Sequence, residues 1–559
     1  MFSYITCNDS NPDIDGLTNS KVLAFDVETS GLSLSSSTNL GFSLAHRYDD
    51  AYYVRPDHEF AKLLTDDRIK VAHNASFDRS MMKKEGVCIN NNIACTMVAA
   101  NMLELKELSL SSVFDYFRAK YEDFPDFDFQ KFKDLDKPID KMSRDELALY
   151  SGPHSIAALA IWNYEQQEMK RLGIDKPFWN IEMPVLPVLS DIELNGVEVD
   201  KDLLISIGES YKEKIEILLE QLNYLSPIKG MNHNSPKQVS HLLYDVFGLP
   251  DQGLSKHTVD KRYLDTIKHL NPYIPVYLLY KQYMTLVNSY IKSLLDEIED
   301  GRIYARFNQA ATKTGRLSSS SPNLQKIPER SEEGKKIRRA FVAPEGKILI
   351  KADYNQLELR ILAICSNEQG LIDAFSSGKD IHTETSLKAF GDDKHRSEAK
   401  TLNYKLVYGG GTDEQRSLLN MSYPGVPKWQ KEFREELLGR EGSLCVRTLG
   451  GRLQTFVGGT SIKDFSSSNK IFREAMSHRI QGSAIEEVKK AMVRCWKVIK
   501  DSDIKMVIQV HDEVLFECPK NKVRDAIDII KNTMESDEYN VPLTLTLSIG
   551  KNWGQVVKL

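Results

Sequence analysis

Apolar residues between Lys21 and Trp162 alternate between short runs and helical spacing. Runs typical of strands occur in KVLAFDVE, GFSLAHR, AYYVRP and IKVAHN, and helical patterns follow in ACTMVAANML and DELALYSGPHSIAALAIW. Strands and helices mixed in this order are typical of an α/β domain. The proline-bearing stretch from Ile174 to Leu189 then predicts a domain boundary, because proline disfavours helix at the residue before it.

From Lys201 to Asp300 the pattern changes to long helices. The segments KDLLISIGESYKEKIEILLEQLNYL and YIPVYLLYKQYMTLVNSYIKSLLDEI repeat apolar residues every three or four positions, which predicts amphipathic helices packed as an antiparallel arm. Farther on, the patterns predict a strand at KILIKADY, a helical region between about residues 360 and 490, and a closing strand pair around VIQVHDEVLFE. The chain thus combines α/β, helical and α+β parts.

Composition narrows the class of protein without deciding its partners. At 559 residues, with 41% hydrophobic and 27% charged positions, the chain resembles soluble globular proteins and has room for about three or four domains. The formal net charge of -6 argues against a general polyanion binder, although basic residues could still cluster in one cleft. Seven scattered cysteines without a CxxC pair, with no leader and no long apolar run, predict reduced thiols and a cytoplasmic location.

The stretch VIQVHDEVLFE places three consecutive ionisable residues between two alternating apolar arms. This pattern predicts a β-hairpin whose tight turn projects His511, Asp512 and Glu513. Taken alone, it also fits an ordinary solvated turn. Asp353 changes the balance, because it lies where the strand KILIKADY ends and a helical pattern begins. Two acidic strand ends in one sheet could hold two divalent cations about 4 Å apart, the arrangement used in phosphoryl transfer.

A stripe of four residues runs along the segment RSEAKTLNYKLVYGGG. Its members recur every four positions and are Arg396, Lys400, Tyr404 and Tyr408. At roughly 100° per residue they drift by about 40° per step and cover roughly 18 Å of one helix face. An ordinary amphipathic helix would carry leucine or valine in such a stripe, whereas here those residues lie elsewhere. Since cations bind phosphates and aromatic rings stack on bases, the stripe matches a nucleoside triphosphate laid along a helix.

The glycine run that follows the stripe, Gly409 to Gly411, predicts the end of that helix.

The N-terminal region carries a second set of candidate metal ligands. Asp26 and Glu28 are two residues apart on a predicted strand and therefore share one face. Asn74 and Asp78 follow at the start of a predicted helix in VAHNASFDRSMM. Paired acids on one face with a third acid nearby form another two-metal pattern.

Several of these segments together resemble the motifs of family A DNA polymerases, the class of bacterial DNA polymerase I and several phage replicases. ADYNQLELR, RSEAKTLNYKLVYG and QVHDEV resemble the three polymerase motifs, and TGRLSSSSPNLQKIP, GKDIH and FREAMSHRIQGSA match further segments in the family's order. DVET resembles the first motif of the DEDD 3′-5′ exonucleases that proofread for this family. The resemblance implies an RNase H-like mixed-sheet exonuclease domain followed by a right-hand polymerase, with an antiparallel palm sheet and helical fingers and thumb.

The resemblance also implies a domain order: an exonuclease-like domain at 1–170, a helical thumb at 171–310, a palm at 311–360 and 481–559, and fingers at 361–480. It implies a template-directed DNA polymerase that adds deoxynucleotides to a primer 3′ end. Primer-template DNA and deoxynucleoside triphosphates are the expected partners, and a monomer is expected. Two Mg²⁺ ions per active site are the expected cofactors, with Mn²⁺ as a substitute. The short stretch before Asp26 predicts no 5′-nuclease domain, and the compact chain predicts a phage replicase.

For the polymerase, the resemblance implies a role for each matching residue. Asp353 and Asp512 would bind the catalytic metals, with Glu513 in support and the Tyr354 carbonyl as a further ligand. Lys400 would bind the triphosphate and protonate the leaving pyrophosphate. The other residues implied to contact the nucleotide are Arg396, His382, Tyr404, Tyr408, Gln356 and Glu358. Those implied to contact primer, template or minor groove are Arg316, Asn323, Gln325, Arg473, Gln481 and His511.

Three positions bear on specificity and on the alternatives. Glu358 matches the steric gate that excludes a 2′-hydroxyl, which disfavours a single-subunit RNA polymerase, the first alternative. Tyr404 stands where many members have phenylalanine, which implies a relaxed rejection of sugars lacking a 3′-hydroxyl. Ser477 stands where the family often has asparagine, so no contact is assigned to it. The second alternative is a non-catalytic DNA-binding protein, which the intact Asp353 and Asp512 disfavour.

The exonuclease resemblance is incomplete at one position. It implies Asp26, Glu28 and Asp78 as metal ligands and Tyr150 in the third motif, but His154 stands where the family has a fourth carboxylate. Mg²⁺ prefers oxygen ligands and imidazole suits softer ions such as Mn²⁺, so His154 predicts a weakened magnesium site. Natural attenuation, a shifted metal preference and deliberate inactivation all stay open, and so does a vestigial exonuclease domain.

Overall fold

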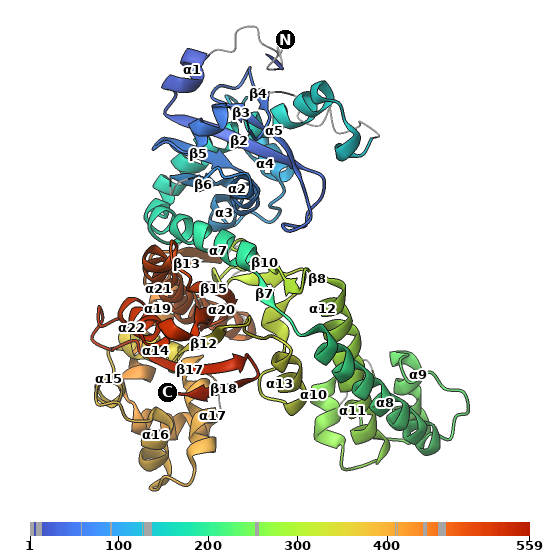
Figure 1. The fold of residues 1–559 in the computed structure, drawn as a ribbon. Helices are drawn as coiled ribbons and strands as arrows, with labels where there is room; N and C mark the ends of the chain where they lie inside the picture. The colour runs from blue at the N-terminus through green and yellow to red at the C-terminus, as the bar shows by residue number, and fades with distance from the viewer. Residues whose placement is uncertain are drawn as a thin grey trace.

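The computed structural model of the chain describes residues 5–6, 14–57, 59–89, 92–125, 127, 137–251, 257–408, 410, 412–439, 444–456 and 465–559. Figure 1 shows an N-terminal α/β body at the top, joined through helix α7 (Met183–Asn195) to a second body below it. A helical arm extends sideways from this second body and carries α8 to α11. The two bodies and the arm each have their own apolar core.

The N-terminal body is built on a six-stranded mixed sheet with the order β1-β4-β3-β2-β5-β6. Its strands are Ile5–Thr6, Val22–Thr29, Asn39–Ala45, Tyr52–Val54, Ile69–Ala72 and Ile93–Cys95, numbered β1 to β6 along the chain. The central strand β2 runs antiparallel to β3 and parallel to β5. Its helices are α1 (Ile14–Asn19), α2 (Ala75–Lys84), α3 (Thr96–Met102), α4 (Leu110–Lys120) and α5 (Arg144–Leu172).

The connection between the bodies is helical and overlaps the boundary predicted at residues 174–189. It consists of α6 (Asp175–Pro177), the π-helical turn η3 (Phe178–Glu182) and α7. Pro184 lies in the first turn of α7, where its missing N–H has no helical acceptor, while Pro187 lies inside the helix and removes one hydrogen bond. The apolar side chains of α7 are buried against both bodies. This burial offsets the free-energy cost of the proline, so the segment is helical despite its low helix propensity.

The arm confirms the long helices predicted between residues 201 and 300. Its two main helices, α8 (Lys201–Leu225) and α11 (Tyr273–Thr285), pack against each other. The Asp200 side chain caps α8 by accepting the Leu203 N–H. Shorter helical elements complete the arm: α9 (Pro236–Ser240), η4 (His241–Val246), α10 (Lys261–Ile267), η5 (Leu286–Ile291) and α12 (Lys292–Asp296). A small sheet at its base joins β7 (Val197–Glu198), β8 (Ile298–Glu299) and β9 (Arg302–Ile303).

The second body contains a five-stranded antiparallel sheet with the order β15-β16-β12-β17-β18. Its strands are β12 (Lys347–Tyr354), β15 (Lys505–Val510), β16 (Glu513–Pro519), β17 (Leu545–Asn552) and β18 (Gln555–Lys558). The predicted strand at KILIKADY and the closing strand pair are therefore present. Helices α14, α21 and α22 lie against this sheet in one large apolar core.

The helices of this second body are α13 (Glu332–Arg339), α14 (Leu357–Ser366), α15 (Gln369–Ser376), α16 (Ile381–Phe390), α17 (Arg396–Val407), α18 (Asp413–Ser422), α19 (Gly425–Gly439), α20 (Phe465–Ser477), α21 (Ser483–Ile499) and α22 (Val523–Met534). The predicted helical region also contains an unpredicted hairpin, β13 (Leu444–Arg447) with β14 (Leu453–Phe456). A second hairpin joins β10 (Arg306–Asn308) and β11 (Ser318–Ser320). Gly409 and Gly411, predicted to end α17, lie outside the described residues.

No helix in the described part of the chain combines the length and the apolar character needed to cross a bilayer.

Candidate functional site

Two carboxylates meet at one end of the antiparallel sheet. Asp353 is the penultimate residue of β12, and Asp512 lies in the turn between β15 and β16. The Val510–Glu513 pair closes this turn and leaves His511 and Asp512 as its two residues. The Tyr354 N–H donates to the Asp512 carbonyl at 3.2 Å, which brings the end of β12 against the turn. The predicted meeting of two acidic strand ends is thus present in the fold.

Glu513 does not project from the turn, which corrects one detail of the predicted hairpin. It is the first residue of β16, pairs with Asp353 across the ladder and is only 5% exposed. Trp553 Nε1 donates to its Oε1 at 2.6 Å, and Lys351 Nζ lies 2.7 Å from its Oε2. Lys351 precedes Asp353 by two residues on the same strand face, so it supplies the positive charge that a buried carboxylate needs. The supporting role predicted for Glu513 stays a prediction.

The electrostatics of this end of the sheet favour a bound cation. Burial, together with the charge of Asp512, raises the pKa of Asp353 to about 7. Burial likewise raises the pKa of Asp512 to about 6, with added repulsion from Glu358 and Glu513 that Arg316 partly offsets. Carboxyl groups with raised pKa values are short of positive charge. Since carboxylate oxygens are the ligands that hard divalent cations prefer, the two residues fit such an ion.

Stability should therefore fall as pH rises when no divalent cation is added. Folded Asp353 keeps a proton that the unfolded chain, with a pKa of about 3.9, already loses. The folded state thus binds more protons between about pH 4 and about pH 7, and the free energy of unfolding decreases through that window. We expect the melting temperature in a chelator to fall more steeply with pH in the wild type than in Asp353→Asn, and divalent cations to reverse the fall. Parallel melting curves for the two proteins would contradict this.

The predicted stripe lies on α17 as expected. Arg396, Lys400 and Tyr404 are exposed, while Tyr408, directly after the helix, is half-buried. The apolar residues of α17 are buried on another face. Arg396 is held by the Asp380 carboxylate, with 2.8 Å between Nη2 and Oδ2, so it must exchange this partner to reach a phosphate. Lys400 and Tyr404 line a shallow pocket with Arg330, a cation that sequence reasoning missed although it follows the predicted TGRLSSSSPNLQKIP segment closely.

His382, which the sequence predicts to bind phosphate, is more buried than a phosphate-binding side chain is expected to be. It is 3% exposed, and its Nδ1 accepts from the Asn403 side-chain amide at 2.9 Å. Burial lowers the pKa of its imidazole, with nearby Arg396 and Lys400 opposing the charged form and Asp380 favouring it. The ring centres of His382 and Tyr404 are 6.5 Å apart. His382 thus lies buried behind Tyr404 of the stripe, and its predicted phosphate contact stays a prediction.

A pocket of about 200 Å³ separates the turn from α17 and α21, and Glu358 stands at its wall. The Arg316 guanidinium contacts Glu358 Oε1 at 2.6 Å. The Tyr408 hydroxyl donates to Glu358 Oε2 at 2.6 Å, and Gln481 Nε2 donates to that hydroxyl at 2.6 Å. Five of the predicted nucleotide or DNA contacts line the same pocket together with Asp512: Arg316, Gln356, Tyr404, Gln481 and His511. The fold therefore brings residues from five distant segments to one pocket.

The remaining predicted DNA contacts lie on both sides of this pocket. Gln325 Nε2 donates to Gln509 Oε1 at 3.0 Å, and the Asn323 side chain accepts from Ser319 at 3.2 Å. Arg473 is exposed on α20. Ser477, to which no contact was assigned, donates to Gln481 Oε1 at 3.2 Å. Gln509 was missed by sequence reasoning, although a polar residue inside the apolar strand KMVIQV is a visible signal.

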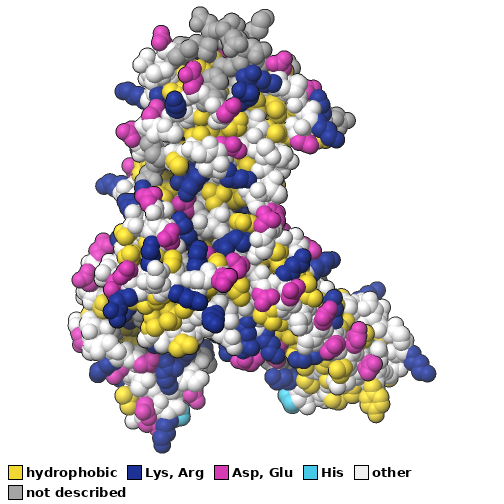
Figure 2. Space-filling model, viewed as in Figure 1, with side chains coloured by type: hydrophobic (Ala, Val, Ile, Leu, Met, Phe, Trp, Pro, Cys, Tyr) yellow, Lys and Arg dark blue, Asp and Glu magenta, His cyan; other side chains and the backbone are white. Residues whose placement is uncertain are grey.

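Lys and Arg side chains, with Asp and Glu among them, are exposed on one face of the molecule despite the net negative charge. Figure 2 shows Lys and Arg side chains across the middle of the viewed face, where the second body meets the arm. Below them the surface is hollowed between the arm and the lobe that carries α16 and α17.

A second carboxylate cluster lies in the N-terminal body. Asp26 and Glu28 point from one face of β2, as predicted, and His154 on α5 reaches them. His154 Nδ1 is 3.3 Å from Asp26 Oδ2 and 3.6 Å from Glu28 Oε1. These three residues each offer one ligand atom within 4.8 Å of the others. The Tyr150 ring lies edge-on to the His154 ring, with 4.9 Å between the ring centres.

Asp78 completes this cluster from the first turn of α2, which begins after Asn74 as predicted. Asp78 Oδ2 and Glu28 Oε1 are buried and have no hydrogen-bond partner. Burial, with the charges of Asp26 and Glu28, raises the pKa of Asp78 well above its usual value. Buried carboxylate oxygens without partners fit a cation.

His154 competes with such a cation for the same place. Burial alone lowers the pKa of His154, but its contacts with Asp26 and Glu28 outweigh burial and raise the pKa to about 9. Burial raises the pKa of Glu28 to about 7, and His154 moderates that rise. The imidazolium therefore supplies positive charge between two acids, which a divalent cation would otherwise supply.

The architecture is that of a polymerase domain of DNA polymerase I. The structure titled "POL domain of Pol1 from M. smegmatis complex with DNA primer-template and dNTP" matches with a TM-score of 0.85 and 24% sequence identity, covering 97% of this chain and 98% of that chain. The family description "DNA polymerase family A" matches residues 201–555, and "3'-5' exonuclease" matches residues 5–160. Because the first of these matches covers more than half of the chain, the chain belongs to DNA polymerase family A.

Bacterial relatives agree with this assignment. "DNA polymerase I" of Chloroflexus aurantiacus is 29% identical over 98% of this chain and 62% of its own length. "DNA polymerase I" of Caldicellulosiruptor bescii is 36% identical over 67% of this chain and 47% of its own length. "DNA polymerase I, thermostable" of Thermus thermophilus is 33% identical over 72% of this chain and 51% of its own length. The chain thus spans about half to two thirds of these relatives. The predicted family and fold class are confirmed, while the phage origin stays a prediction.

Proposed function

We propose that this protein is a template-directed DNA polymerase that adds deoxynucleotides to a primer 3′ end by two-metal phosphoryl transfer. One observation carries the proposal: Asp353 and Asp512 meet at the end of an antiparallel sheet, across one pocket from the cationic and aromatic stripe of α17. The solved structure with the same fold is named as a complex with primer-template DNA and a deoxynucleotide. We propose the same partners for this chain.

Asp353 and Asp512 would hold two Mg²⁺ ions, with the Tyr354 carbonyl as a further ligand. The chemistry supplied by the bound ions is activation of the primer 3′-hydroxyl and neutralisation of the leaving pyrophosphate. Lys400 and Arg396 bind the triphosphate from the exposed face of α17, and Lys400 protonates the pyrophosphate. Lys351 lies closer to Glu513, at 2.7 Å, than to Asp353, at 3.7 Å, so it neutralises Glu513 more strongly than Asp353.

We assign the second body and the arm to the parts of a polymerase hand. The palm comprises residues 311–360 and 481–559, the fingers residues 361–480, and the thumb residues 171–310. Primer and template lie along the hollowed, basic face of Figure 2. The residues that contact them are Arg316, Asn323, Gln325, Arg473, Gln481 and His511. Lysine and arginine gathered on one face supply the attraction to phosphates that the net charge does not.

Glu358 selects deoxyribose by crowding the position of a 2′-hydroxyl. Its carboxylate is held by Arg316 and Tyr408, so it cannot swing away to admit a ribose. We expect Glu358→Ala to incorporate ribonucleotides on the order of 100-fold more efficiently relative to deoxynucleotides, because a well-placed clash costs several kcal/mol. The measurement is kcat/KM for each nucleotide in primer extension, with Glu345→Ala, an exposed residue outside this pocket, as the control. Efficient ribonucleotide use by the wild type would instead favour an RNA polymerase.

A second candidate function, 3′-5′ exonucleolytic proofreading, rests on the cluster of Asp26, Glu28 and Asp78. The buried Asp78 Oδ2, which has no hydrogen-bond partner beside the two other acids, is the reason to expect metal binding there. His154 supplies positive charge in place of a metal ion, and it thereby attenuates hydrolysis in Mg²⁺. A shift towards Mn²⁺ follows if His154 coordinates the ion through nitrogen.

Primer extension by the wild type, with each nucleotide omitted in turn and in Mg²⁺ and then Mn²⁺, tests the main proposal. Template-dependent addition of the complementary nucleotide is the expected result. DNA binding without extension in either metal would leave the non-catalytic DNA-binding protein as the better reading.

A further inference from the structure

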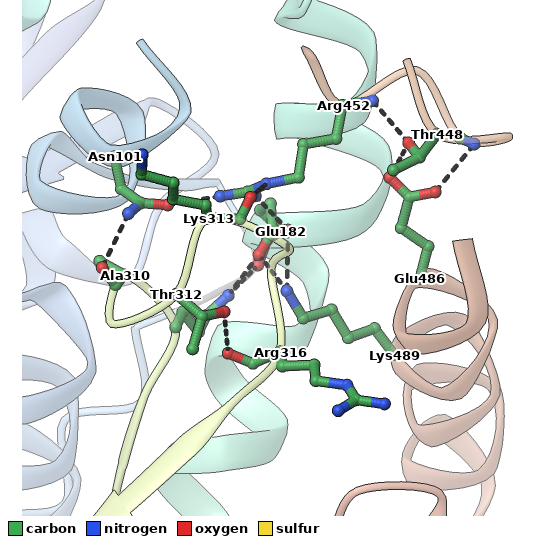
Figure 3. A network of polar contacts seen from close by, with 12 residues as sticks. Asn101, Glu182, Ala310, Thr312, Lys313, Arg316, Thr448, Arg452, Glu486 and Lys489 are labelled. Carbon is green, nitrogen blue, oxygen red and sulfur yellow. Dashed lines mark hydrogen bonds and ion pairs between the residues drawn. The ribbon is translucent and has the colours of Figure 1, made fainter. Parts of the chain in front are cut away.

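A buried charge cluster lies between the two bodies, away from both carboxylate sites (Figure 3). Glu182, at the end of η3, is 2% exposed and contacts Arg452 Nη1 at 2.9 Å and Lys489 Nζ at 2.7 Å. Lys489 is fully buried and Arg452 nearly so. Burial raises the pKa of Glu182, but the charges of Lys489 and Arg452 outweigh burial and hold that pKa below its usual value. Glu182 is therefore an ionised carboxylate bound by two cations.

Each member of this cluster comes from a different element. Glu182 belongs to the connection between the bodies, Lys489 to α21 beneath the antiparallel sheet, and Arg452 to the β13–β14 hairpin. Glu486, one turn before Lys489 on α21, accepts from the Thr448 hydroxyl at 2.6 Å and the Gly450 N–H at 2.8 Å. Buried ion pairs add little net stability, because desolvation cancels most of their attraction, but they define one relative position of the groups they join. The cluster thus fixes three elements in register.

The cluster also holds one irregular segment, residues 309–316, through hydrogen bonds. Gln309 Nε2 donates to the Glu182 carbonyl at 3.0 Å and to its Oε2 at 3.1 Å. Arg452 Nε donates to the Lys313 carbonyl at 3.4 Å. Within the segment, the Thr312 hydroxyl donates to the Arg316 carbonyl at 2.8 Å. In Figure 3 the segment runs beside the contact between Glu182 and Arg452 and leads to Arg316.

Asn101 brings the N-terminal body into this arrangement. It lies near the end of α3, and its Nδ2 donates to the Ala310 carbonyl at 2.8 Å while its Oδ1 accepts from Arg452 Nη2. The segment it holds ends at Arg316, whose guanidinium fixes Glu358 in the polymerase pocket. A continuous set of contacts therefore runs from the exonuclease-like body through residues 309–316 to the wall of the nucleotide pocket.

We propose that Asn101 and Glu182 are positioning residues for sugar selection: through segment 309–316 they hold Arg316 against Glu358. Discrimination against ribonucleotides then depends on the exonuclease-like body, even when the carboxylate cluster of that body does not support hydrolysis. This inference rests on the proposed polymerase function and on Glu358 as the sugar gate. It gives the N-terminal body a role in synthesis that is separate from hydrolysis.

The test is Asn101→Ala, which removes two hydrogen bonds and touches neither carboxylate site. We expect the ratio of kcat/KM for deoxynucleotide over ribonucleotide to fall by about three- to tenfold, the range of coupling that such contact networks carry. The matched control is Glu104→Gln, three residues farther on. Glu104 accepts from the Thr455 N–H at 2.8 Å and from its hydroxyl, so it also ties the N-terminal body to β14, but no hydrogen bond or ion pair described for it reaches segment 309–316. It should lower the melting temperature and leave the ratio unchanged.

A double-mutant cycle separates positioning from general loosening. In a Glu358→Ala background, Asn101→Ala should change the ratio no further, because the gate it positions is gone. Glu182→Gln, which leaves Arg452 and Lys489 buried without their anion, should lower the ratio at least as much as Asn101→Ala. The inference is overturned by an unchanged ratio in folded Asn101→Ala, by an equal fall in Glu104→Gln, or by additive effects in the cycle. Absence of primer extension by the wild type would instead remove the proposed function and the inference with it.

Discussion

Asp512→Asn is expected to abolish primer extension while the protein stays folded and binds primer-template DNA. A carboxylate that binds the catalytic cations contributes several kcal/mol to the transition state, so extension should slow by at least about 10³-fold. Asparagine has almost the same shape, and it removes a buried acid whose charge adds to burial in raising the pKa of Asp353. The melting temperature in a chelator should therefore stay the same or rise.

Single-turnover extension and fluorescence anisotropy of labelled primer-template measure the two halves of this expectation. Glu513→Gln is the matched control, since it changes the adjacent acid on the same hairpin. Glu513 is already paired with Lys351 and Trp553, so its replacement should reduce stability and slow extension far less than Asp512→Asn. Near-wild-type extension by Asp512→Asn would refute the assignment of the catalytic pair, and equal losses in both variants would make Glu513 a ligand as well.

His154→Asp is expected to accelerate hydrolysis of a mismatched 3′ end in Mg²⁺ by roughly 100-fold or more. The wild type has an imidazolium 3.3 Å from Asp26, which supplies the positive charge that Mg²⁺ would bring. Aspartate removes that charge and adds a hard oxygen ligand beside Asp26, Glu28 and Asp78. The measurement is release of the terminal nucleotide from a mismatched, labelled primer without deoxynucleotides.

His154→Asn is the control that divides two causes. It removes the positive charge without adding a carboxylate, so a gain in both variants would show that charge competition causes the attenuation. A gain in Asp only would show that a missing ligand causes it. The polymerase rate on a matched primer should be the same in all three proteins, because His154 lies in the other body. Equal hydrolysis by wild type and His154→Asp in Mg²⁺ would contradict attenuation, and wild-type hydrolysis in Mn²⁺ but not Mg²⁺ would favour nitrogen coordination.

Much of the candidate site could be predicted because its chemistry follows local periodicity. The stripe of α17 needs only a period of 3.6 residues, and the shared face of Asp26 and Glu28 needs only a period of two. Asp353 at a strand end was readable because the apolar alternation stops there. The hairpin turn was placed to within one residue, and the error at Glu513 arose because the ladder begins one position earlier than the change in polarity suggests.

Other features depended on partners far away in the chain. Nothing near Glu358 indicates that Arg316 and Tyr408 would hold it from both sides. The ion pair of His154 with Asp26 spans more than a hundred residues of chain, so sequence reasoning could note the missing carboxylate but not the charge that replaced it. The helix across Pro187 was not predicted for the same reason, since the apolar faces that stabilise it belong to both bodies.

The amino-acid sequence by itself therefore determined most of the main helices and strands, which residues carry metal-binding, phosphate-binding and base-stacking groups, and which family the chain resembles. Those properties depend on residues that are close together in the chain, because backbone geometry there sets which side chains share a face. The tertiary structure alone decided which charges meet: Lys351 with Glu513, His154 with Asp26, and Glu182 with Arg452 and Lys489. Such pairs form only when burial removes water and distant segments become neighbours, so the ionisation and orientation of each group depend on the whole fold.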